Sequence, residues 1–231
     1  MDFVAGEVLL LDKPMEWTSF DVVNKIRISL KPICGKLKVG HAGTLDPLAT
    51  GLLIICTGKK TKEIDSYQAQ DKTYTGTITL GMTTPTYDAE MPADAHFETS
   101  HITADMILAT AQKFVGEIEQ VPPVYSAVKV DGKKAYVEKR RGNEIELKKR
   151  TVTIFDFQIT KIEMPVVSFS VKCSKGTYIR SLAFDFGKAL DSGAFLSSLR
   201  REKIGDFDVA NAWKLTDFLT HLKEIEDKIS V

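Results

Sequence analysis

The sequence is poor in cysteine and histidine and carries no excess charge of either sign. Its 231 residues include three Cys and four His, and 31 Lys plus Arg balance 31 Asp plus Glu. Cys34, Cys56 and Cys173 are odd in number and far apart, which disfavours disulfides and zinc knuckles and predicts reduced, mostly buried thiols. The histidines lack a metal-ligand spacing such as His-Glu-x-x-His. The sequence therefore argues against a metal enzyme, and any attraction to nucleic acid must come from local patches of charge.

Long hydrophobic runs and an N-terminal leader are also missing. The longest apolar run covers residues 51–56, far short of the roughly 18 residues expected of a membrane span. Residues 1–7 contain neither a basic segment nor a signal-length apolar core. We therefore expect a cytoplasmic protein without membrane contact.

Hydrophobic periodicity predicts a mixture of strands and helices. Apolar residues make up 43% of the chain, enough for a sizeable core in a single fold of this length. Strands are expected at residues 8–11, 52–56, 72–80, 124–130, 152–162 and 166–173. One helix is expected from Ser19 to Pro32. Further helices are expected to begin near residues 59, 103, 133, 177 and 215. The pattern favours an α+β fold with a mixed, mainly antiparallel sheet flanked by helices, in one domain spanning residues 1–231.

The densest group of Gly, His, Thr and Asp lies within residues 39–50, a stretch without regular period that is expected to be a loop. Asp46 is the acidic residue of this stretch, and His41 is its basic residue. An Asp in such a loop either caps a turn, as Asp before Pro often does, or performs covalent or acid–base chemistry. The neighbours typical of aspartic proteases and aspartyl-phosphate enzymes are missing, and Gly58-Lys59 does not complete a phosphate-binding P-loop. From these residues alone, both interpretations of Asp46 stay open.

Positive charge is concentrated in one segment. Residues 129–150 contain nine bases and four acids, a net charge of +5, which leaves −5 on the rest of the chain. Such a run is typical of a solvated surface, but also of an arm that grips phosphates, because Tyr136 lies among the bases and exposed aromatics stack on nucleotides. The candidate RNA-binding residues of this basic arm, near residues 124–150, are Lys129, Lys133, Lys134, Lys139, Arg140 and Arg141.

Several motifs, following one another along most of the chain, carry a resemblance. The stretch Gly40-His-Ala-Gly-Thr-Leu-Asp-Pro-Leu-Ala-Thr-Gly-Leu-Leu53 is very similar to the signature of the TruB family, the tRNA pseudouridine(55) synthases. Further matches are Leu11-Asp-Lys-Pro14, Trp17-Thr-Ser-Phe-Asp21, Asp71-Lys-Thr-Tyr74, Pro122-Pro-Val-Tyr-Ser-Ala127, Cys173-Ser-Lys-Gly-Thr-Tyr-Ile-Arg180, Leu199-Arg-Arg201 and Ile204-Gly205.

The resemblance implies a pseudouridine synthase catalytic fold that isomerises uridine to pseudouridine in the T-loop of tRNA, with neither a metal nor an organic cofactor. The uridine must break its N-glycosidic bond, turn while held and rejoin through C5, and Asp46 matches the family's nucleophile for this step. Arg180 matches the cation that keeps the carboxylate charged and aimed. Tyr74 matches the tyrosine on the target base, which agrees with its inward position in the strand expected at residues 72–80.

Four further residues match substrate-binding positions of the family. His41 matches the side chain that fills the space left by the flipped base. Tyr178 matches another pocket residue, Lys62 a lysine near the pocket, and Asp88 an acid in a loop. Without the family, His41 is typical of a structural histidine and Lys62 of a solvated lysine.

The chain departs from the family in two places. The family's Thr-Asp-Thr-x-Asp followed by Ala-x-Gly is here Thr84-Pro-Thr-Tyr-Asp88-Ala-Glu-Met91, with Pro85 and Met91 in place of the first Asp and the last Gly. Only one helix is expected after Ala212-Trp-Lys-Leu215, so we expect no extra C-terminal RNA-binding domain like that of many bacterial members. RNA affinity should then rest on the catalytic domain and its basic arm.

We expect a monomer whose partner is the T-arm of tRNA, and two alternatives stay open. One is a non-catalytic RNA chaperone or binding module that keeps the fold without turnover. The other is a synthase of the same family that acts on a uridine in another RNA, because RNA choice rests on shape and loop contacts. The presence of Asp46, Tyr74 and Arg180 favours an enzyme, and the order in which Asp46 attacks ribose or base is left open.

Overall fold

The computed structural model describes residues 1–126, 129–130, 133–134 and 147–229. The chain forms two compact units. The first unit comprises Met1–Tyr74 and Arg200–Val231, and the second comprises Thr75–Leu199. Strands β4 (Lys72–Leu80) and β12 (Ala194–Ile204) contribute residues to both units.

The sheet of the first unit has the order β14 (Trp213–Lys214), β1 (Val8–Lys13), β3 (Ala49–Thr57) and β12. Strand β1 is antiparallel to β3 and parallel to β14. Two short strands extend it: β2 (Val39–His41) is antiparallel to β3, and β13 (Phe207–Asp208) is antiparallel to β12. The sheet is therefore mixed, as the sequence predicts.

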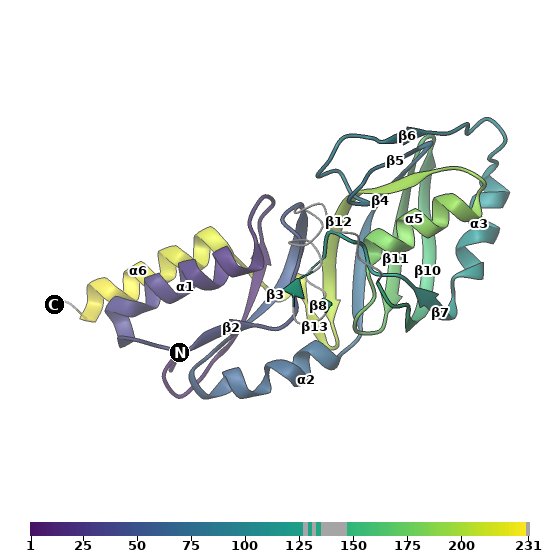
Figure 1. Ribbon diagram of the computed structural model, residues 1–231. Helices are drawn as coiled ribbons and strands as arrows, with labels where there is room; N and C mark the ends of the chain where they lie inside the picture. The colour runs from purple at the N-terminus through teal and green to yellow at the C-terminus, as the bar shows by residue number, and fades with distance from the viewer. Residues whose placement is uncertain (127–128, 131–132, 135–146, 230–231) are drawn as a thin grey trace. The chain divides into compact units, whose positions relative to one another are not determined.

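Two amphipathic helices, α1 (Ser19–Cys34) and α6 (Leu215–Ile229), lie side by side in this unit (Figure 1). Their apolar stripes bury a core against alternate residues of β1 and β3, among them Leu11, Leu53 and Ile55. The remaining residues of β3 pack in a second cluster, so that this strand is buried on both faces. Shorter helical segments complete the unit: η1 (Gly58–Glu63), α2 (Ile64–Ala69) and η2 (Val209–Asn211).

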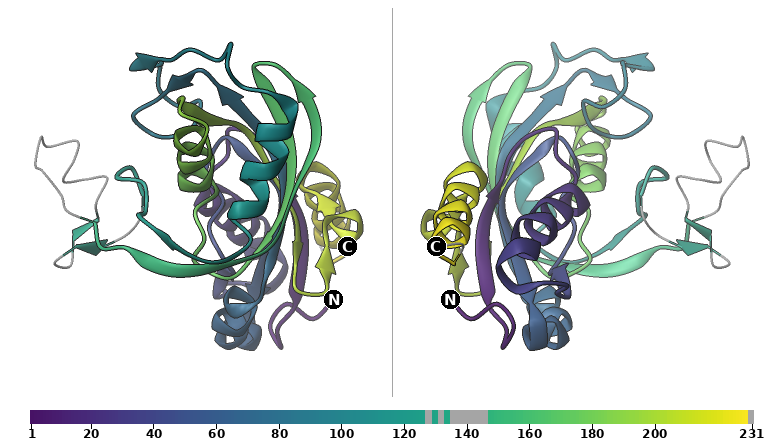
Figure 2. Two further views of the ribbon diagram at one scale, coloured as in Figure 1. Left: turned by 90° about the vertical axis from the view of Figure 1, so that its right-hand side faces the viewer. Right: turned by 90° about the vertical axis from the view of Figure 1, so that its left-hand side faces the viewer.

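The sheet of the second unit has the order β12, β4, β11 (Val166–Cys173), β10 (Arg150–Glu163) and β7 (Gly116–Gln120). Strand β10 is antiparallel to both β11 and β7. Helices α3 (Ala104–Lys113) and α5 (Ile179–Ala189) lie on the same face of this sheet (Figure 2). Between them and the sheet, the rings of Phe114, Phe157, Phe169 and Phe186 pack against one another, edge to face except for the tilted pair Phe114–Phe186.

Two small antiparallel pairs lie outside these sheets. Strand β5 (Met82–Thr83) pairs with β6 (Ala95–His96), and β8 (Lys129–Val130) pairs with β9 (Lys133–Lys134). None of the described helices is both long and apolar enough to cross a membrane. The three cysteines are reduced thiols, with Cys56 and Cys173 buried and Cys34 half-buried, as predicted.

The α+β prediction is confirmed, and several element boundaries are corrected. The expected loop at residues 39–50 is shorter, because β2 and β3 occupy its two ends. Helix α1 is capped by Thr18 rather than Ser19 and continues past Pro32. The strand expected from residue 124 is wrong for 124–126, which form a bend, and residues 133–134 form a strand rather than a helix. Strands β7 and β12 were not predicted. The single domain over residues 1–231 stays a prediction.

Candidate active site

Asp46 lies in a seven-residue connection, residues 42–48, between strands β2 and β3 of the first unit. Its side chain is half-buried. The connection is anchored at both ends by backbone hydrogen bonds: Ala42 donates to the carbonyl of Ile54 at 2.9 Å, and Ala49 donates to the carbonyl of Asp46 at 3.1 Å. We call residues 42–48 the Asp46 loop.

The start of helix α1 holds the middle of the Asp46 loop. The hydroxyl of Ser19, 2% exposed, accepts from the backbone N–H of Leu45 at 2.8 Å and donates to the Leu45 carbonyl at 3.2 Å. Ser19 is fixed in turn by a capping box, in which Thr18 and Asp21 satisfy each other's backbone N–H groups. The residue that precedes Asp46 is therefore held through both of its backbone polar groups.

Lys13, the last residue of β1, bonds to the loop on the C-terminal side of Asp46. Its fully buried Nζ donates to the carbonyls of Pro14, Trp17 and Pro47 at 2.9, 2.6 and 3.2 Å. Burial lowers the pKa of Lys13 from 10.5 to about 8, and the negative charge of Asp46 partly offsets that effect. The residue that follows Asp46 is thus bonded to a buried ammonium group.

Arg201, on strand β12, bonds to the loop on the N-terminal side of Asp46. Its guanidinium is 1% exposed and donates to the carbonyls of Leu52 at 2.8 Å, Gly43 at 3.1 Å and Thr44 at 3.5 Å. Gly51 has a φ of 103°, and a Cβ there would lie 2.3 Å from the Arg201 carbonyl oxygen. Glycine is therefore required where β3 passes Arg201.

Three buried groups thus hydrogen-bond to the backbone of the Asp46 loop: Arg201 before Leu45, Ser19 at Leu45 and Lys13 after it. Lys13 and Arg201 donate to carbonyl oxygens of this backbone, and the charge of Lys13 also interacts with that of Asp46. The backbone that carries the Asp46 carboxylate is thus fixed, and covalent catalysis by a side chain requires a well-defined position.

His41 and Lys62 lie in the same unit as Asp46. His41 ends β2 and is half-buried; burial, and then the charge of Arg201, lower the pKa of its imidazole below the ordinary value. Both effects favour the neutral form of His41. Lys62 is exposed on η1.

Tyr74 is on strand β4 and ends the N-terminal segment of the first unit. It is 8% exposed, and burial alternates along β4 between Lys72 and Tyr74 on one side and Thr73 and Thr75 on the other. Its predicted inward position is confirmed.

Arg180 and Asp88 meet in the second unit. Arg180 is 5% exposed on the first turn of α5, and its Nη1 lies 3.6 Å from Oδ2 of Asp88 and donates to the carbonyls of Thr86 and Tyr125 at 3.1 Å each. Despite Pro85 and Met91, the atypical loop is ordered around Asp88, whose carbonyl accepts from the hydroxyl of Thr84. Asp46 belongs to the first unit, so the approach of Arg180 to Asp46 stays a prediction.

Tyr178 lies one residue before α5 and is half-buried. Of the basic arm, Lys129 is in β8, and Lys133 and Lys134 form β9. Lys139, Arg140 and Arg141 lie outside the described residues. The RNA-binding role of the arm stays a prediction.

Sequence reasoning assigned no part in the site to Lys13, Ser19 and Arg201. A signal was present for each, because Lys13 is in Leu11-Asp-Lys-Pro14, Ser19 in Trp17-Thr-Ser-Phe-Asp21 and Arg201 in Leu199-Arg-Arg201. Those motifs lie far from Asp46 in the chain, and only the fold brings them to the Asp46 loop. Within the described part of the chain, no group of three His, Cys, Asp or Glu residues is arranged to hold a metal ion.

Two solved structures resemble this chain in fold. One is a chain of a Cbf5–Nop10–Gar1 complex, 30% identical with a TM-score of 0.73, matched over 94% of this chain and 54% of that chain. The other is from an H/ACA RNP bound to a substrate RNA containing 2′-deoxyuridine, 26% identical with a TM-score of 0.72, matched over 99% of this chain and 56% of that chain. This chain spans about half the length of each of these two chains.

Sequence relatives cover the chain from end to end. Residues 31–179 match the TruB family pseudouridylate synthase (N terminal domain) model. The chain is 54% identical over 220 residues to tRNA pseudouridine synthase B of Flavobacterium johnsoniae, a match that covers 94% of this chain and 96% of that protein. It is 50% identical to tRNA pseudouridine synthase B of Phocaeicola vulgatus over the full length of both proteins. The chain therefore belongs to the TruB family of pseudouridylate synthases.

Proposed function

We propose that this protein isomerises a uridine to pseudouridine in the T-loop of tRNA, at position 55, with Asp46 as the nucleophile. The observation that carries the proposal is the grip of Lys13, Ser19 and Arg201 on the Asp46 loop. A carboxylate that only capped a turn would need no such support from two fully buried cations. The relatives named tRNA pseudouridine synthase B support the choice of RNA.

The proposed reaction breaks the bond between N1 of uracil and C1′ of ribose and forms a bond between C5 and C1′. Asp46 holds the sugar or the base while the base turns, and leaves when the new bond forms. The proton on C5 passes to solvent, and N1 gains a proton. Product and substrate have the same atoms and the same oxidation level, so the reaction as a whole consumes no oxidant, reductant or second substrate.

The remaining candidate residues divide between holding the base and neutralising charge. We assign the ring of Tyr74 to packing against the flipped uracil, and neutral His41 to the space that the uracil leaves in the T-loop. Arg180 supplies the cation for Asp46, and Asp88, 3.6 Å from it, fixes its direction. We assign Tyr178 to the pocket that receives the uracil, and Lys62 to a position near that pocket.

Phosphates of the T-arm are assigned to the basic arm, because its residues 129–150 carry a net charge of +5 in a chain that is neutral as a whole. The protein is proposed to act as a monomer, since one T-arm needs one Asp46. A cytoplasmic location follows from tRNA as the substrate.

The proposal is tested by incubating the purified protein with unmodified tRNA and mapping pseudouridine by base-specific chemistry. Pseudouridine at position 55 of the T-loop is the expected result. A modified uridine in a different RNA, with the T-loop unchanged, would favour the synthase with another substrate. Tight binding without any pseudouridine would favour the RNA-binding module.

A further inference from the structure

The backbone just before helix α5 is held by a buried amide. Gln120, the last residue of β7, is 1% exposed. Its Nε2 donates to the carbonyl of Tyr178 at 3.0 Å, and its Oε1 accepts from the N–H of Tyr178 at 2.7 Å. The primary amide thus satisfies both backbone polar groups of Tyr178, as a neighbouring strand would.

The ring of Tyr178 is held from the neighbouring strand. Arg150, the first residue of β10, is directly opposite Gln120 in the β7–β10 pair. The Arg150 guanidinium carbon lies 5.3 Å from the centre of the Tyr178 ring, within the range of a cation–π contact. One cross-strand pair, Gln120 and Arg150, therefore fixes both the main chain and the ring of Tyr178.

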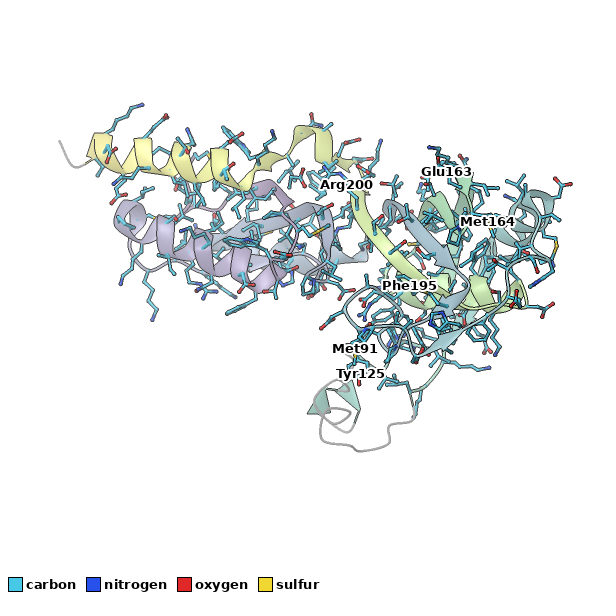
Figure 3. The ribbon with its side chains drawn as sticks, turned by 90° about the horizontal axis from the view of Figure 1, so that it is seen from above. Met91, Tyr125, Glu163, Met164, Phe195 and Arg200 are labelled. Atoms are coloured by element: carbon cyan, nitrogen blue, oxygen red, sulfur yellow. The ribbon has the colours of Figure 1, made fainter. Side chains whose placement is uncertain are left out.

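Two more side chains join α5 to the segment that follows β7. The hydroxyl of Ser181, 2% exposed, donates to the carbonyl of Val121 at 2.7 Å. Arg180 donates to the carbonyl of Tyr125, which is labelled in Figure 3. The first turn of α5 thus depends on this segment for its position, and Gln120 supplies two of the hydrogen bonds.

We propose that Gln120 is a positioning residue for the reaction: through Tyr178, it places the first turn of α5 so that Tyr178 and Arg180 meet the uridine. The inference rests on the proposed function, since it takes both side chains to face the RNA. Arg150 serves the same end by holding the Tyr178 ring.

The position requires a side chain with one donor and one acceptor on the same planar group. A protonated Glu offers the same pair, whereas an ionised Glu has acceptors alone and would face the Tyr178 carbonyl with negative charge. Burial, together with hydrogen bonds that only the neutral acid can make, raises the pKa of a carboxyl group at this position. Gln120→Glu should therefore keep the clamp at low pH and lose it as pH rises through that raised pKa.

The experiment measures kcat and KM for release of tritium from C5-labelled uridine in tRNA, between about pH 5.5 and pH 8.5, for wild type, Gln120→Glu and Gln120→Met. We expect Gln120→Glu to have a kcat within about threefold of wild type at the low end and at least about tenfold lower at the high end. Gln120→Met should be low throughout. Each profile is divided by that of wild type, which removes the pH dependence of the chemistry itself.

Amide hydrogen exchange at Tyr178, measured on the protein without RNA, gives a second readout. The N–H should be protected in wild type, and in Gln120→Glu only at low pH. The matched control is Gln158→Glu, an exposed residue of β10 in the same sheet, whose profile should follow wild type. If wild type releases no tritium, the proposed function fails, while the exchange data still test the clamp.

The inference is overturned if Gln120→Met, melting as cooperatively as wild type, retains wild-type kcat. It is equally overturned if Gln120→Glu loses Tyr178 protection with pH while its kcat follows wild type, because the hydrogen bonds would then serve the fold alone. Recovery of activity at low pH in one and the same sample shows that a low kcat at high pH is not irreversible misfolding.

Discussion

The guanidinium of Arg201 donates to the carbonyl oxygen of Gly43 across 3.1 Å, and so ties strand β12 to the Asp46 loop. Arg200, its neighbour in the chain and labelled in Figure 3, instead forms a two-bond ion pair with Asp12 at 3.0 and 2.7 Å and is about one-third exposed. The two adjacent arginines therefore have different roles: Arg201 supports the Asp46 loop, and Arg200 forms an ordinary surface ion pair.

Arg201→Lys should lower both activity and stability, because an ammonium group cannot reach three carbonyls in one plane as the guanidinium does. We expect a loss of about 2 to 4 kcal/mol in the free energy of unfolding and at least about tenfold in kcat. Arg200→Lys should cost less than about 1 kcal/mol and leave kcat near wild type. Equal effects of the two substitutions, in thermal melts and tritium release, would contradict the role given to Arg201.

Lys13 should make activity and stability respond to pH in opposite directions. Its pKa is about 8 in the folded protein and 10.5 in the unfolded chain, so between these values the unfolded state binds more protons. This group's contribution to stability therefore rises with pH above about 8. Its positive charge beside the Asp46 loop is lost over the same range, and tritium release should fall.

Measurements between about pH 7 and pH 9.5 test this prediction, with the side-chain amine of Lys13 followed by NMR. Lys13→Arg, which stays charged, is the matched comparison where it folds. A Lys13 amine that is still fully protonated at about pH 9.5 would remove the stated cause of the activity loss.

Glu16 has a φ of 67° in the turn between β1 and α1, a left-handed conformation that disfavours residues with a Cβ. Its N–H donates to the Pro47 carbonyl at 2.9 Å, so this turn also supports the Asp46 loop. Glu16→Gly should stabilise the protein by about 0.5 to 1 kcal/mol, because it removes the strain and keeps the hydrogen bond. Glu16→Ala should give no such gain in urea unfolding, and an equal gain from Ala would mean that strain is not the cause.

Reversing Lys139, Arg140 and Arg141 to Glu should weaken tRNA binding and flatten its salt dependence, because fewer phosphate counterions are released. Reversing three exposed lysines of the first unit, Lys214, Lys223 and Lys228, is the matched charge control. Filter binding over a range of salt concentrations distinguishes the two. The same salt slope for the arm variant and wild type would identify the basic run as a solvated surface.

The sequence predicts the strands and helices that have a clear period, such as β4, β11 and α6. It fails for β12, whose residues 194–204 mix Ser, Arg, Lys and Glu because the strand carries Arg201 and Arg200 for specific partners instead of a regular apolar face. It fails for β7 because Gly116 and two glutamates leave this short strand without an apolar pattern that would predict it. Charged and polar pairs override the periodic signal in both cases.

The candidate site divides in the same way. Asp46, Tyr74 and Arg180 could be selected because their motifs resemble a family, and the inward position of Tyr74 follows from strand alternation. Lys13 and Arg201 lie in motifs that match the family, but their support of the Asp46 loop could not be predicted, since the two residues are separated by most of the chain and bond to backbone carbonyls, which every residue has. The contact of Gln120 with Tyr178 could not be predicted for the same reason, since Gln120 bonds to backbone groups far away in the chain.

Asp46→Asn tests the central claim most directly, because the amide keeps the shape and hydrogen-bonding reach of the carboxylate and removes its charge. Tritium release from C5-labelled uridine in tRNA and filter binding are measured on the same preparation. We predict no detectable turnover and unchanged or tighter tRNA binding, since a negative charge facing a phosphate-rich ligand is gone. Tritium release at near the wild-type rate by folded Asp46→Asn protein would contradict the assignment of Asp46 as the nucleophile.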